Sequence, residues 1–256
     1  MRRTRSTGRH AASTPDAEIE PWSFSLEELL WADAANPGFP KGQRTLLKLK
    51  AGAAATLNAM PYQTMRVADI VKAAGVSHGL FYHYFTDKQA VTLEILTELM
   101  RTSDSRYGRI HASTDAFESL YVANTYYLNV YRKNAGLMRA ALSLSDEVDT
   151  FRQAWNDTVD RWHKRIARAV RAQSSQANIL NADADLLAYC LGAMIDQILR
   201  QLFVQQNPYL RQLALDQRHL AEVLSIAWFR ATHGRDPTPK QIEACRALKM
   251  TAQATA

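Results

Sequence analysis

The chain has 256 residues and a net charge of +6, and 47% of its residues are hydrophobic. This combination allows a large buried core, in one domain or two small ones, and excludes global disorder. Two cysteines without a CxxC pair argue against a disulfide scaffold and a zinc finger, so a reducing cytoplasm is the expected location. The apolar run at 186–195 is far shorter than the ~20 residues that cross a bilayer, and no apolar stretch follows the N-terminal arginines, so we expect neither a membrane span nor a secretory signal.

The first 40 residues are predicted to precede the folded body as an extension. Residues 1–20 are rich in Arg, Ser, Thr and Ala without periodicity and are expected to be disordered. They form either a solvated tail or a basic arm that adds contacts to DNA phosphates. Apolar residues at helical spacing predict a short helix over 25–35, ended by the Asn-Pro-Gly-Phe-Pro sequence at 36–40, and an alanine-rich helix over 41–60.

The stretch 67–91 predicts two short helices joined by a tight turn. Apolar residues at helical spacing form a buried stripe on the first helix, and Gly75 supplies the left-handed conformation that ends it. Ser77 is a natural N-cap for the second helix, in which Phe81 and Phe85, four residues apart, are expected to face the core. The polar and aromatic side chains left on the other side suit a helix that lies in the major groove of DNA.

The remainder of the chain is predicted to be helical as well, and the fold class is all-α. The Thr-x-x-Gln sequence at 86–89 has the form of a capping box, and the helix that it starts should run to about Tyr107. Its two apolar faces suggest a helix that contacts two bodies. Gly234 ends the last large helix, and one weak helix is expected in the tail. The helices expected between these points cover 115–133, 135–144, 148–172, 183–205 and 215–232, with a polar break at 174–181.

The charge is distributed unevenly along the chain. Residues 1–10 carry +4 and residues 11–40 carry −6, whereas residues 41–90 hold seven bases against two acids. The basic excess therefore coincides with the segment that contains the glycine turn. This is the pattern expected of a surface that binds phosphates.

The residues from Ile70 to Val91 resemble the DNA-binding signature of the TetR family of bacterial transcriptional regulators. The matching sequence is Ala-Gly-Val-Ser at 74–77, Gly79, Phe-Tyr-His-Tyr-Phe at 81–85 and Asp-Lys at 87–88. The resemblance implies an N-terminal three-helix helix-turn-helix DNA-binding domain, followed by a larger helical domain for ligand binding and dimerisation.

The resemblance also implies roles for individual residues. Tyr82 and Lys88 match positions that usually touch the DNA backbone, and Lys88 is expected in the first turn of a helix, where the dipole favours a phosphate. Leu80 departs from the small hydroxyl residue that is common there and can pack on a thymine methyl. Arg66 replaces the usual Ser or Thr cap, with Thr64 available instead, and is expected to contact phosphate or, alternatively, to be a solvated surface charge. The expected DNA-contacting residues are Arg66, Ser77, His78, Leu80, Tyr82, His83 and Lys88.

Enzymatic and metal-binding alternatives find little support, so we assign no catalytic residue, cofactor or metal site. His78 and His83 have a poor spacing for metal ligands, and no third ligand joins them. The sequence has no phosphate-cradling glycine loop and no Gly-x-Ser-x-Gly motif. Cys190 lies in a strongly apolar helix and is expected to be a buried, inert thiol. The five bases at 161–171 are expected to form a solvated face, with capture of an anionic ligand as the alternative.

The second half of the chain resembles the family's effector-binding and dimerisation domain by position and helical content. The helices at 183–205 and 215–232 would form a four-helix bundle with a symmetry mate, or else an internal core, since a helix that is apolar nearly all round must be covered on every side. Asp196 needs a partner there, either an intersubunit base or a ligand. The pocket candidates, for which core packing is the alternative, are Tyr121, Tyr127, Met138, Trp155, Trp162, Met194 and Asp196.

The sequence therefore predicts a cytoplasmic, homodimeric regulator, a repressor rather than an activator, that binds a palindromic double-stranded DNA operator and is released by a small, largely apolar effector. A ligand-free activator, or an adaptor controlled by a partner protein, is the alternative. A large apolar cavity at Tyr127 and Trp155 would favour the first function, and a filled core the second. The expected domains are an extension at 1–40, the DNA-binding domain at 41–90, the effector-binding and dimerisation domain at 91–234, and a tail at 235–256.

Overall fold

The computed structural model describes residues 23–110, 113–173, 183–214 and 216–248, and this part of the chain consists of helices and connecting turns without a β-strand. The all-α prediction is therefore confirmed. The expectations for the tail at 1–20 and for the polar break at 174–181 lie outside the described residues.

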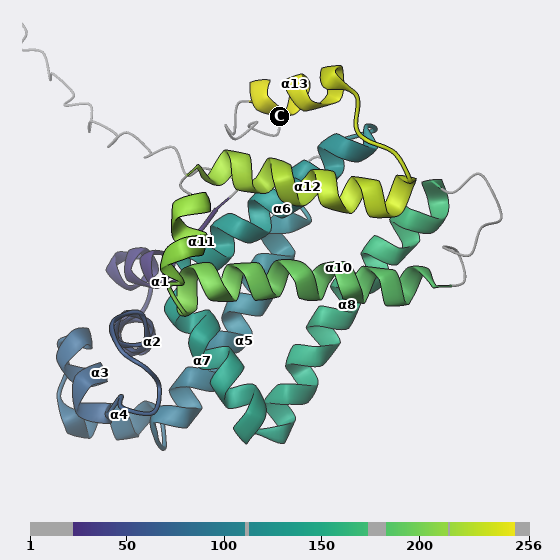
Figure 1. The fold of residues 1–256 in the computed structure, drawn as a ribbon. Helices are drawn as coiled ribbons and strands as arrows, with labels where there is room; N and C mark the ends of the chain where they lie inside the picture. The colour runs from purple at the N-terminus through teal and green to yellow at the C-terminus, as the bar shows by residue number, and fades with distance from the viewer. Residues whose placement is uncertain (1–22, 111–112, 174–182, 215, 249–256) are drawn as a thin grey trace, which may run out of the picture.

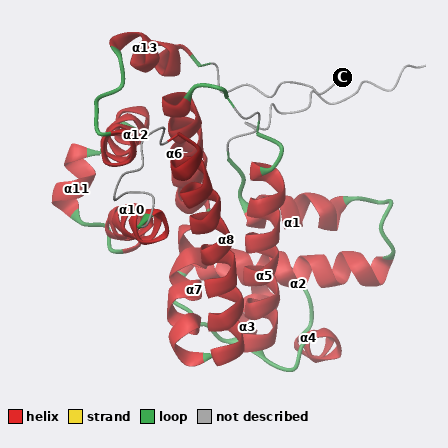
Figure 2. Cartoon of the chain, turned by 90° about the vertical axis from the view of Figure 1, so that its right-hand side faces the viewer, coloured by secondary structure: helices red, strands yellow, loops and turns green. Residues whose placement is uncertain are grey.

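The N-terminal part of the molecule contains a three-helix head and two helices that join it to the body. The head lies at one end of the molecule, where α3 and α4 pack beside α2 and the beginning of α5 (Figures 1 and 2). The predicted helices of this region are confirmed, with ends that differ by one or two residues. They are α1 (Leu26–Ala35), α2 (Lys41–Ala59), α3 (Val67–Ala74), α4 (His78–Tyr84) and α5 (Lys88–Tyr107).

The start of α5 differs from the prediction. Asp87 is the N-cap: its backbone is extended, and its carboxylate accepts a hydrogen bond from the N–H of Ala90 at 2.8 Å. The hydroxyl of Thr86 donates to the same carboxylate at 3.4 Å. The capping box predicted for Thr86 and Gln89 is therefore wrong, because a carboxylate one residue later satisfies a free N–H and also complements the helix dipole.

The body follows α5, and most of its helices agree with those predicted from the spacing of apolar residues. An additional short helix, α11, was not predicted; the side chain of Asn207 caps it by accepting from the N–H groups of Tyr209 and Leu210, and Pro208 occupies its first turn. A π-helical turn, η1, ends the apolar helix α10. The elements of the body are α6 (Ala116–Lys133), α7 (Ala135–Glu147), α8 (Asp149–Gln173), α10 (Ala184–Leu199), η1 (Arg200–Val204), α11 (Pro208–Leu213), α12 (Gln217–His233) and α13 (Pro239–Ala247).

The helix expected in the tail is present as α13 and is docked on the body at the end opposite the head (Figure 2). Thr238 and Gln241 form a capping box at its start. Cys245 is buried against α6 and α12, and this burial raises the pKa of its thiol to about 12. Arg246 makes a two-pronged ion pair with Glu222 of α12, at 2.6 and 2.7 Å.

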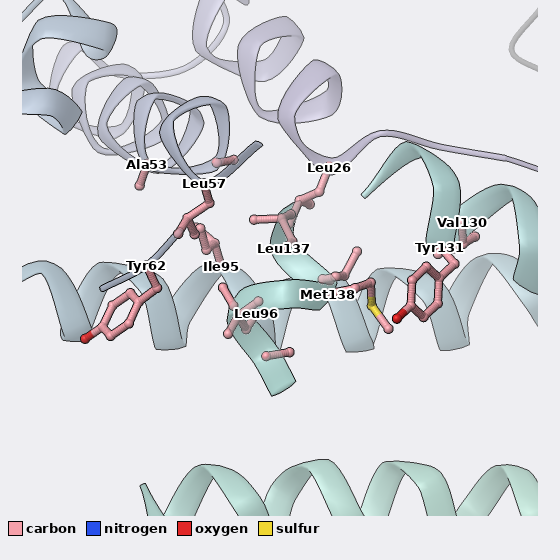
Figure 3. Packing of buried hydrophobic residues seen from close by; sticks show 14 of the residues in the cluster. Leu26, Ala53, Leu57, Tyr62, Ile95, Leu96, Val130, Tyr131, Leu137 and Met138 are labelled. Carbon is pink, nitrogen blue, oxygen red and sulfur yellow. The ribbon is translucent and has the colours of Figure 1, made fainter. Parts of the chain in front are cut away.

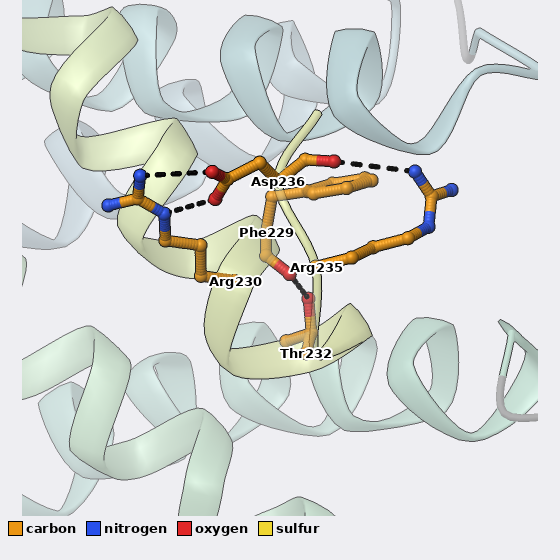
Figure 4. Close-up of polar contacts among 5 residues, drawn as sticks. All are labelled: Phe229, Arg230, Thr232, Arg235 and Asp236. Carbon is orange, nitrogen blue, oxygen red and sulfur yellow. Dashed lines mark hydrogen bonds and ion pairs between the residues drawn. The ribbon is translucent and has the colours of Figure 1, made fainter. Parts of the chain in front are cut away.

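The end of α12 falls at Gly234, as predicted, and Gly234 has a φ of +65°. This is the left-handed region that favours glycine at the end of a helix. Figure 4 shows how the following residues fold back: Asp236 pairs with Arg230, and the guanidinium of Arg235 lies 5.2 Å from the ring centre of Phe229. The hydroxyl of Thr232 donates to the carbonyl of Trp228 at 2.8 Å and, more weakly, to that of Phe229. These contacts direct the chain from α12 towards α13.

The head and the body share one continuous core (Figure 3). Leu57 of α2, Ile95 and Leu96 of α5, and Leu137 of α7 are all buried in it. Helix α5 therefore contacts both the head and the body, as its two apolar faces suggested. A second contact is made by α7, where a Cβ on Gly136 would lie 2.5 Å from the Cα of Asn58, so α7 approaches α2 at a distance that only glycine permits.

Helix α1 connects the two parts from outside. Leu26, Leu30 and Ala34 bury its inner face against α2. The side chain of Asn134, at the junction of α6 and α7, accepts from the N–H of Leu26 at 2.9 Å and donates to the carbonyl of Phe24 at 2.8 Å. The segment predicted as part of an extension is thus fastened to the head and to the body at once.

One helical stretch among the described residues, Ala184–Val204, is long and apolar enough to span a membrane by length and composition. Its mean hydropathy is 1.2, and only 28% of it is buried. Core helices of water-soluble proteins pass the same test, so this is weak support for a span. It does identify a helix that has large apolar residues exposed within one chain, namely Leu186 and Tyr189.

Candidate DNA-binding surface and ligand cavity

The turn between α3 and α4 has the geometry of a helix-turn-helix. Gly75 has a φ of +64°, the N–H of Val76 donates to the carbonyl of Val71, and the N–H of Gly75 donates to that of Lys72. These two bonds form a Schellman motif, which satisfies the free carbonyls at the end of α3. The hydroxyl of Ser77 then accepts from the N–H of Leu80 at 3.4 Å and begins α4, as predicted.

Helix α4 has one buried and one exposed side. Phe81 is fully buried and lies 5.8 Å from Phe85, ring centre to ring centre, so the two expected core anchors are confirmed. The opposite side carries five exposed residues from the predicted DNA-binding set. These are Ser77, His78, Leu80, Tyr82 and His83, and Tyr82 is 54% exposed.

Lys88 occupies a different position from the one expected for a phosphate contact. Its ammonium group donates to the carbonyl oxygens of Tyr62, Gln63 and Met65 at 3.0, 3.3 and 2.9 Å. It also lies 4.6 Å from the ring centre of Tyr62. An ammonium has three donors, and here all three are used within the chain, because the connection between α2 and α3 points its carbonyls at this site. In this conformation Lys88 stabilises the head from inside.

Arg66 is exposed, and its side chain makes no helix cap. Its backbone N–H donates to the carboxylate of Asp69 at 2.9 Å, which closes the start of α3. The alternative cap, Thr64, instead donates its hydroxyl to the carbonyl of Pro61. The guanidinium of Arg66 therefore remains at the surface, where it is available to a phosphate.

The basic excess of residues 41–90 is not all at the surface. Lys50 is buried and pairs with Glu94, at 3.1 Å, and with Glu98, both on α5. Lys50 and Lys88 thus serve the interior of the head. The bases of this segment that are exposed are Lys41, Lys48, Arg66 and Lys72.

The body contains an apolar cavity of about 270 Å³ that is partly open to the surface. Its wall is formed by α5, α6, α7, α8, α10 and α12, and α5 contributes Leu99, Met100, Ser103 and Tyr107. Five of the seven predicted pocket residues line it. They are Tyr127, Met138, Trp155, Trp162 and Asp196.

Two predicted pocket residues lie elsewhere. Tyr121 belongs to a separate buried cluster with Phe117 and Cys245 under α13. Met194 is partly buried against the main core but is not among the residues that line the cavity. Helical spacing identifies an inward face, but it does not decide which part of the core each side chain on that face reaches.

Asp196 and Tyr127 form the polar centre of the cavity. The hydroxyl of Tyr127 donates to Asp196 at 2.5 Å. Burial raises the pKa of Asp196 above its ordinary value, while the hydrogen bond from Tyr127 acts in the opposite direction. Burial also raises the pKa of Tyr127, so this hydroxyl keeps its proton as the donor. The partner that Asp196 was expected to require is, within one chain, a tyrosine.

His163 is a cavity residue that the sequence did not reveal. It is 92% buried, although it lies on the long basic helix α8, and burial lowers the pKa of its imidazole. The signal available was the apolar stripe at 155, 159, 162 and 166, which marks the inner face of α8. The bases of α8 whose side chains are described are exposed, and Arg165 in addition lies over the rings of Trp162 and Tyr107 at the edge of the cavity.

An exposed apolar surface covers parts of α10, α11 and α12. The expectation that Cys190 is buried is wrong within a single chain, because Cys190 lies on this surface and is exposed. Uncovered apolar residues of this size on three adjacent helices are unusual for a monomer. The large residues of this surface are Leu186, Tyr189, Tyr209, Leu213 and Val223.

Comparisons with known proteins agree with this arrangement. Residues 50–95 match the family model of bacterial regulatory proteins of the TetR family, and residues 122–234 match the model of the C-terminal domain of the transcriptional regulator EthR. The HTH-type transcriptional regulator EthR of Mycolicibacterium smegmatis is 21% identical over 201 residues, which cover 77% of this chain and 90% of that protein. EthR of Mycobacterium tuberculosis is 22% identical over 215 residues, which cover 79% and 97%.

Solved structures show the same fold. A transcriptional regulator from Rhodococcus sp. Rha1 superposes with a TM-score of 0.63 at 18% identity, covering 76% of this chain and 99% of that one. The fatty acid degradation regulator FadR from Bacillus halodurans superposes with a TM-score of 0.55 at 17% identity, covering 75% and 96%.

A helix-turn-helix head on a larger helical body defines a DNA-binding transcriptional regulator. The members of this class that match here are regulators of transcription in bacteria. The chain belongs to the TetR family of bacterial regulatory proteins, and its body is similar to the C-terminal domain of EthR.

Proposed function

We propose that this protein is a ligand-responsive repressor of the bacterial cytoplasm, which binds a palindromic operator as a dimer and is released by a small, largely apolar effector. The observation that carries the proposal is the cavity of about 270 Å³, lined by the same helix α5 whose N-terminal half packs in the DNA-binding head. We retain the division into a DNA-binding domain at 41–90 and an effector-binding and dimerisation domain at 91–234. Helix α1 and helix α13 are added to these domains as docked elements.

The apolar surface on α10, α11 and α12 supports the dimer. Leu186, Tyr209 and Leu213 are 65%, 70% and 61% exposed, which is costly in water. A two-fold axis would bring the same surface of a second copy against it and cover both. The predicted interface through 183–205 and 215–232 is thereby extended to include α11.

DNA reading is proposed for the exposed side of α4. Ser77, His78, Leu80 and His83 would face base edges or the backbone in the major groove, and Tyr82 and Arg66 would contact phosphates. A dimer places two such helices on one face of the duplex, so the half-sites should lie ~34 to 36 Å apart or at a multiple of that distance.

Release by an effector requires that the ligand prefers one arrangement of the heads. Two elements can carry the change. Helix α5 lines the cavity with Leu99 and Met100 and begins at the head. Helix α7 lines it with Met138, and its Arg139 donates to the carbonyl of Leu57 in α2 at 2.7 Å.

The operator and the role of His78 can be tested together. Selection from a pool of randomised duplexes should enrich a two-fold symmetric sequence, and sedimentation of the selected duplex should show two protein chains bound. His78→Ala should enrich a different base at one position of each half-site, because a base-edge contact is lost. Failure to enrich any symmetric sequence would contradict the operator proposal, and an unchanged sequence would remove His78 from the base-reading set.

Lys88 and Arg66 are expected to respond in opposite ways to alanine. Lys88→Ala removes three hydrogen bonds and should lower the free energy of unfolding by roughly 1–3 kcal/mol, while the salt dependence of binding to a non-specific duplex stays the same. Arg66→Ala should leave the free energy of unfolding within about 0.5 kcal/mol and reduce the slope of log K against log salt by about 1. Urea unfolding and fluorescence anisotropy measure the two quantities. A reduced slope in Lys88→Ala would return Lys88 to the phosphate-binding set.

The alternative function is a ligand-free activator or an adaptor controlled by a partner protein. A filled core around Tyr127 and Trp155 was the feature that would favour it. The apolar cavity between these residues favours the ligand-responsive function.

A further inference from the structure

The cavity holds an acidic side chain that no base among the described residues neutralises. Asp196 accepts one hydrogen bond, from Tyr127, and the ion pairs found in the described part of the chain do not include it. A carboxylate offers about four acceptor positions, so a single hydroxyl leaves most of its capacity unused. An anion in an apolar cavity is costly unless a positive or donating group satisfies it.

A second polar side chain of the cavity, His163 of α8, contacts α10 one helical turn from Asp196. The Nδ1 atom of His163 is buried and has no hydrogen-bond partner. The imidazole rests on Gly192, where a Cβ would collide with Nε2, and Gly192 is one helical turn before Asp196 on the same side of α10. Burial lowers the pKa of His163, so the ring is neutral at pH 7 and does not supply a positive charge to Asp196. His163 thus adds a neutral side chain, and no positive charge, to the cavity wall that contains Asp196.

The other walls suit an apolar body next to a cation. Trp155, Trp162 and Tyr107 supply aromatic faces, which attract cations as well as hydrocarbon. The guanidinium of Arg165 already lies over the rings of Trp162 and Tyr107, 5.0 and 5.6 Å from the ring centres. Arg165 is exposed and would repel a second cation nearby. The charged end of a ligand therefore belongs on the α10 wall, with its apolar body directed towards α5 and α6.

We propose that the cavity binds a small amphiphilic amine, whose ammonium group donates to Asp196. This ligand class rests on the proposed function, in which the same cavity is the effector site. The ammonium would supply the positive partner that Asp196 lacks, and the alkyl or aryl part would fill the apolar space. A neutral or acidic ligand of the same length leaves Asp196 as it is or places two anions together.

Three probes of equal chain length separate these possibilities: octylamine, octanol and octanoate, titrated into the full-length protein at pH 7 in a calorimeter. Octylamine is expected to bind about tenfold more tightly than octanol and more tightly still than octanoate. Competition between octylamine and octanol should show that both occupy one site. Octanol or octanoate binding as tightly as octylamine rejects the amine class while keeping the cavity as a ligand site. If none of the three binds, both the amine class and the effector site are rejected.

Two variants test the role of the carboxylate. Asp196→Asn should reduce the preference for octylamine over octanol to less than about threefold, with octanol affinity retained. Tyr127→Phe removes the competing donor but keeps the carboxylate, so the preference for octylamine should rise by about threefold or more. Far-UV circular dichroism checks that each variant is folded. A preference that survives in Asp196→Asn, or that falls in Tyr127→Phe, overturns the proposal.

Discussion

Replacing Phe81 by alanine is expected to lower the free energy of unfolding by about 3–5 kcal/mol. Phe81 is fully buried under α4 and packs on Phe85, so truncation leaves a cavity in the small core of the head. The loss should also abolish DNA binding, because α4 is a seven-residue helix that depends on this packing for its position. Urea unfolding followed by circular dichroism measures the change.

The neighbouring residue provides a matched control. Tyr82 is also aromatic and also on α4, but its ring is 54% exposed. Tyr82→Ala should lower the free energy of unfolding by less than about 1 kcal/mol while weakening DNA binding. If Tyr82→Ala destabilised the protein as much as Phe81→Ala, the assignment of a buried and an exposed side to α4 would be incorrect.

Replacing Asn134 by alanine is expected to lower the free energy of unfolding by roughly 2–4 kcal/mol, because buried polar groups left without partners cost ~1–3 kcal/mol each. The groups affected are the N–H of Leu26 and the carbonyl of Phe24, both in buried residues. Helix α1 should then detach from the body. Hydrogen exchange over Leu26–Ala35 is expected to accelerate before that of α2.

Asn58→Ala is the control for this prediction. Asn58 also contacts α1, through a hydrogen bond to Glu27 at 2.7 Å, but this bond is exposed to solvent. Its loss should lower the free energy of unfolding by less than about 1 kcal/mol and leave exchange in α1 nearly unchanged. Equal effects of the two substitutions would show that burial of the Asn134 bonds does not matter, contrary to the structure.

The fastening of α1 adds an element to the route between cavity and DNA. Asn134 stands at the junction of α6 and α7, and both helices line the cavity. A ligand that moves this junction would move α1, and through it α2. The head is therefore connected to the body through α5, α7 and α1, and the contacts of two of these helices resist a shift of the third.

Local patterns in the sequence were sufficient for the helices and the head. The roles of Gly75, Ser77, Phe81 and Phe85 depend on contacts with residues nearby in the sequence. The turn, the N-cap and the buried side of α4 can therefore be predicted from residue spacing alone. The failures in secondary structure were local as well. Asp87, and not Thr86, is the N-cap of α5. Helix α11 has six residues, which is too short for a helical period of apolar residues to be recognised.

Contacts between distant segments required the tertiary structure. The sequence around Lys88 does not predict that its ammonium group donates to the carbonyls of Tyr62, Gln63 and Met65. In the same way, the separation of Tyr121 from Tyr127 into different clusters depends on where α13 and α10 dock.

By itself, the sequence predicted an all-helical chain with a basic, DNA-binding helix-turn-helix, because helix periodicity, a turn glycine and local charge are properties of neighbouring residues, and its resemblance to the TetR family implied a regulator. Only the tertiary structure decided which bases reach the surface, how α1 is fastened, and that Asp196, Tyr127 and His163 line one cavity. These features involve residues that are tens of positions apart in the sequence, and their side chains come into contact only when the helices pack together.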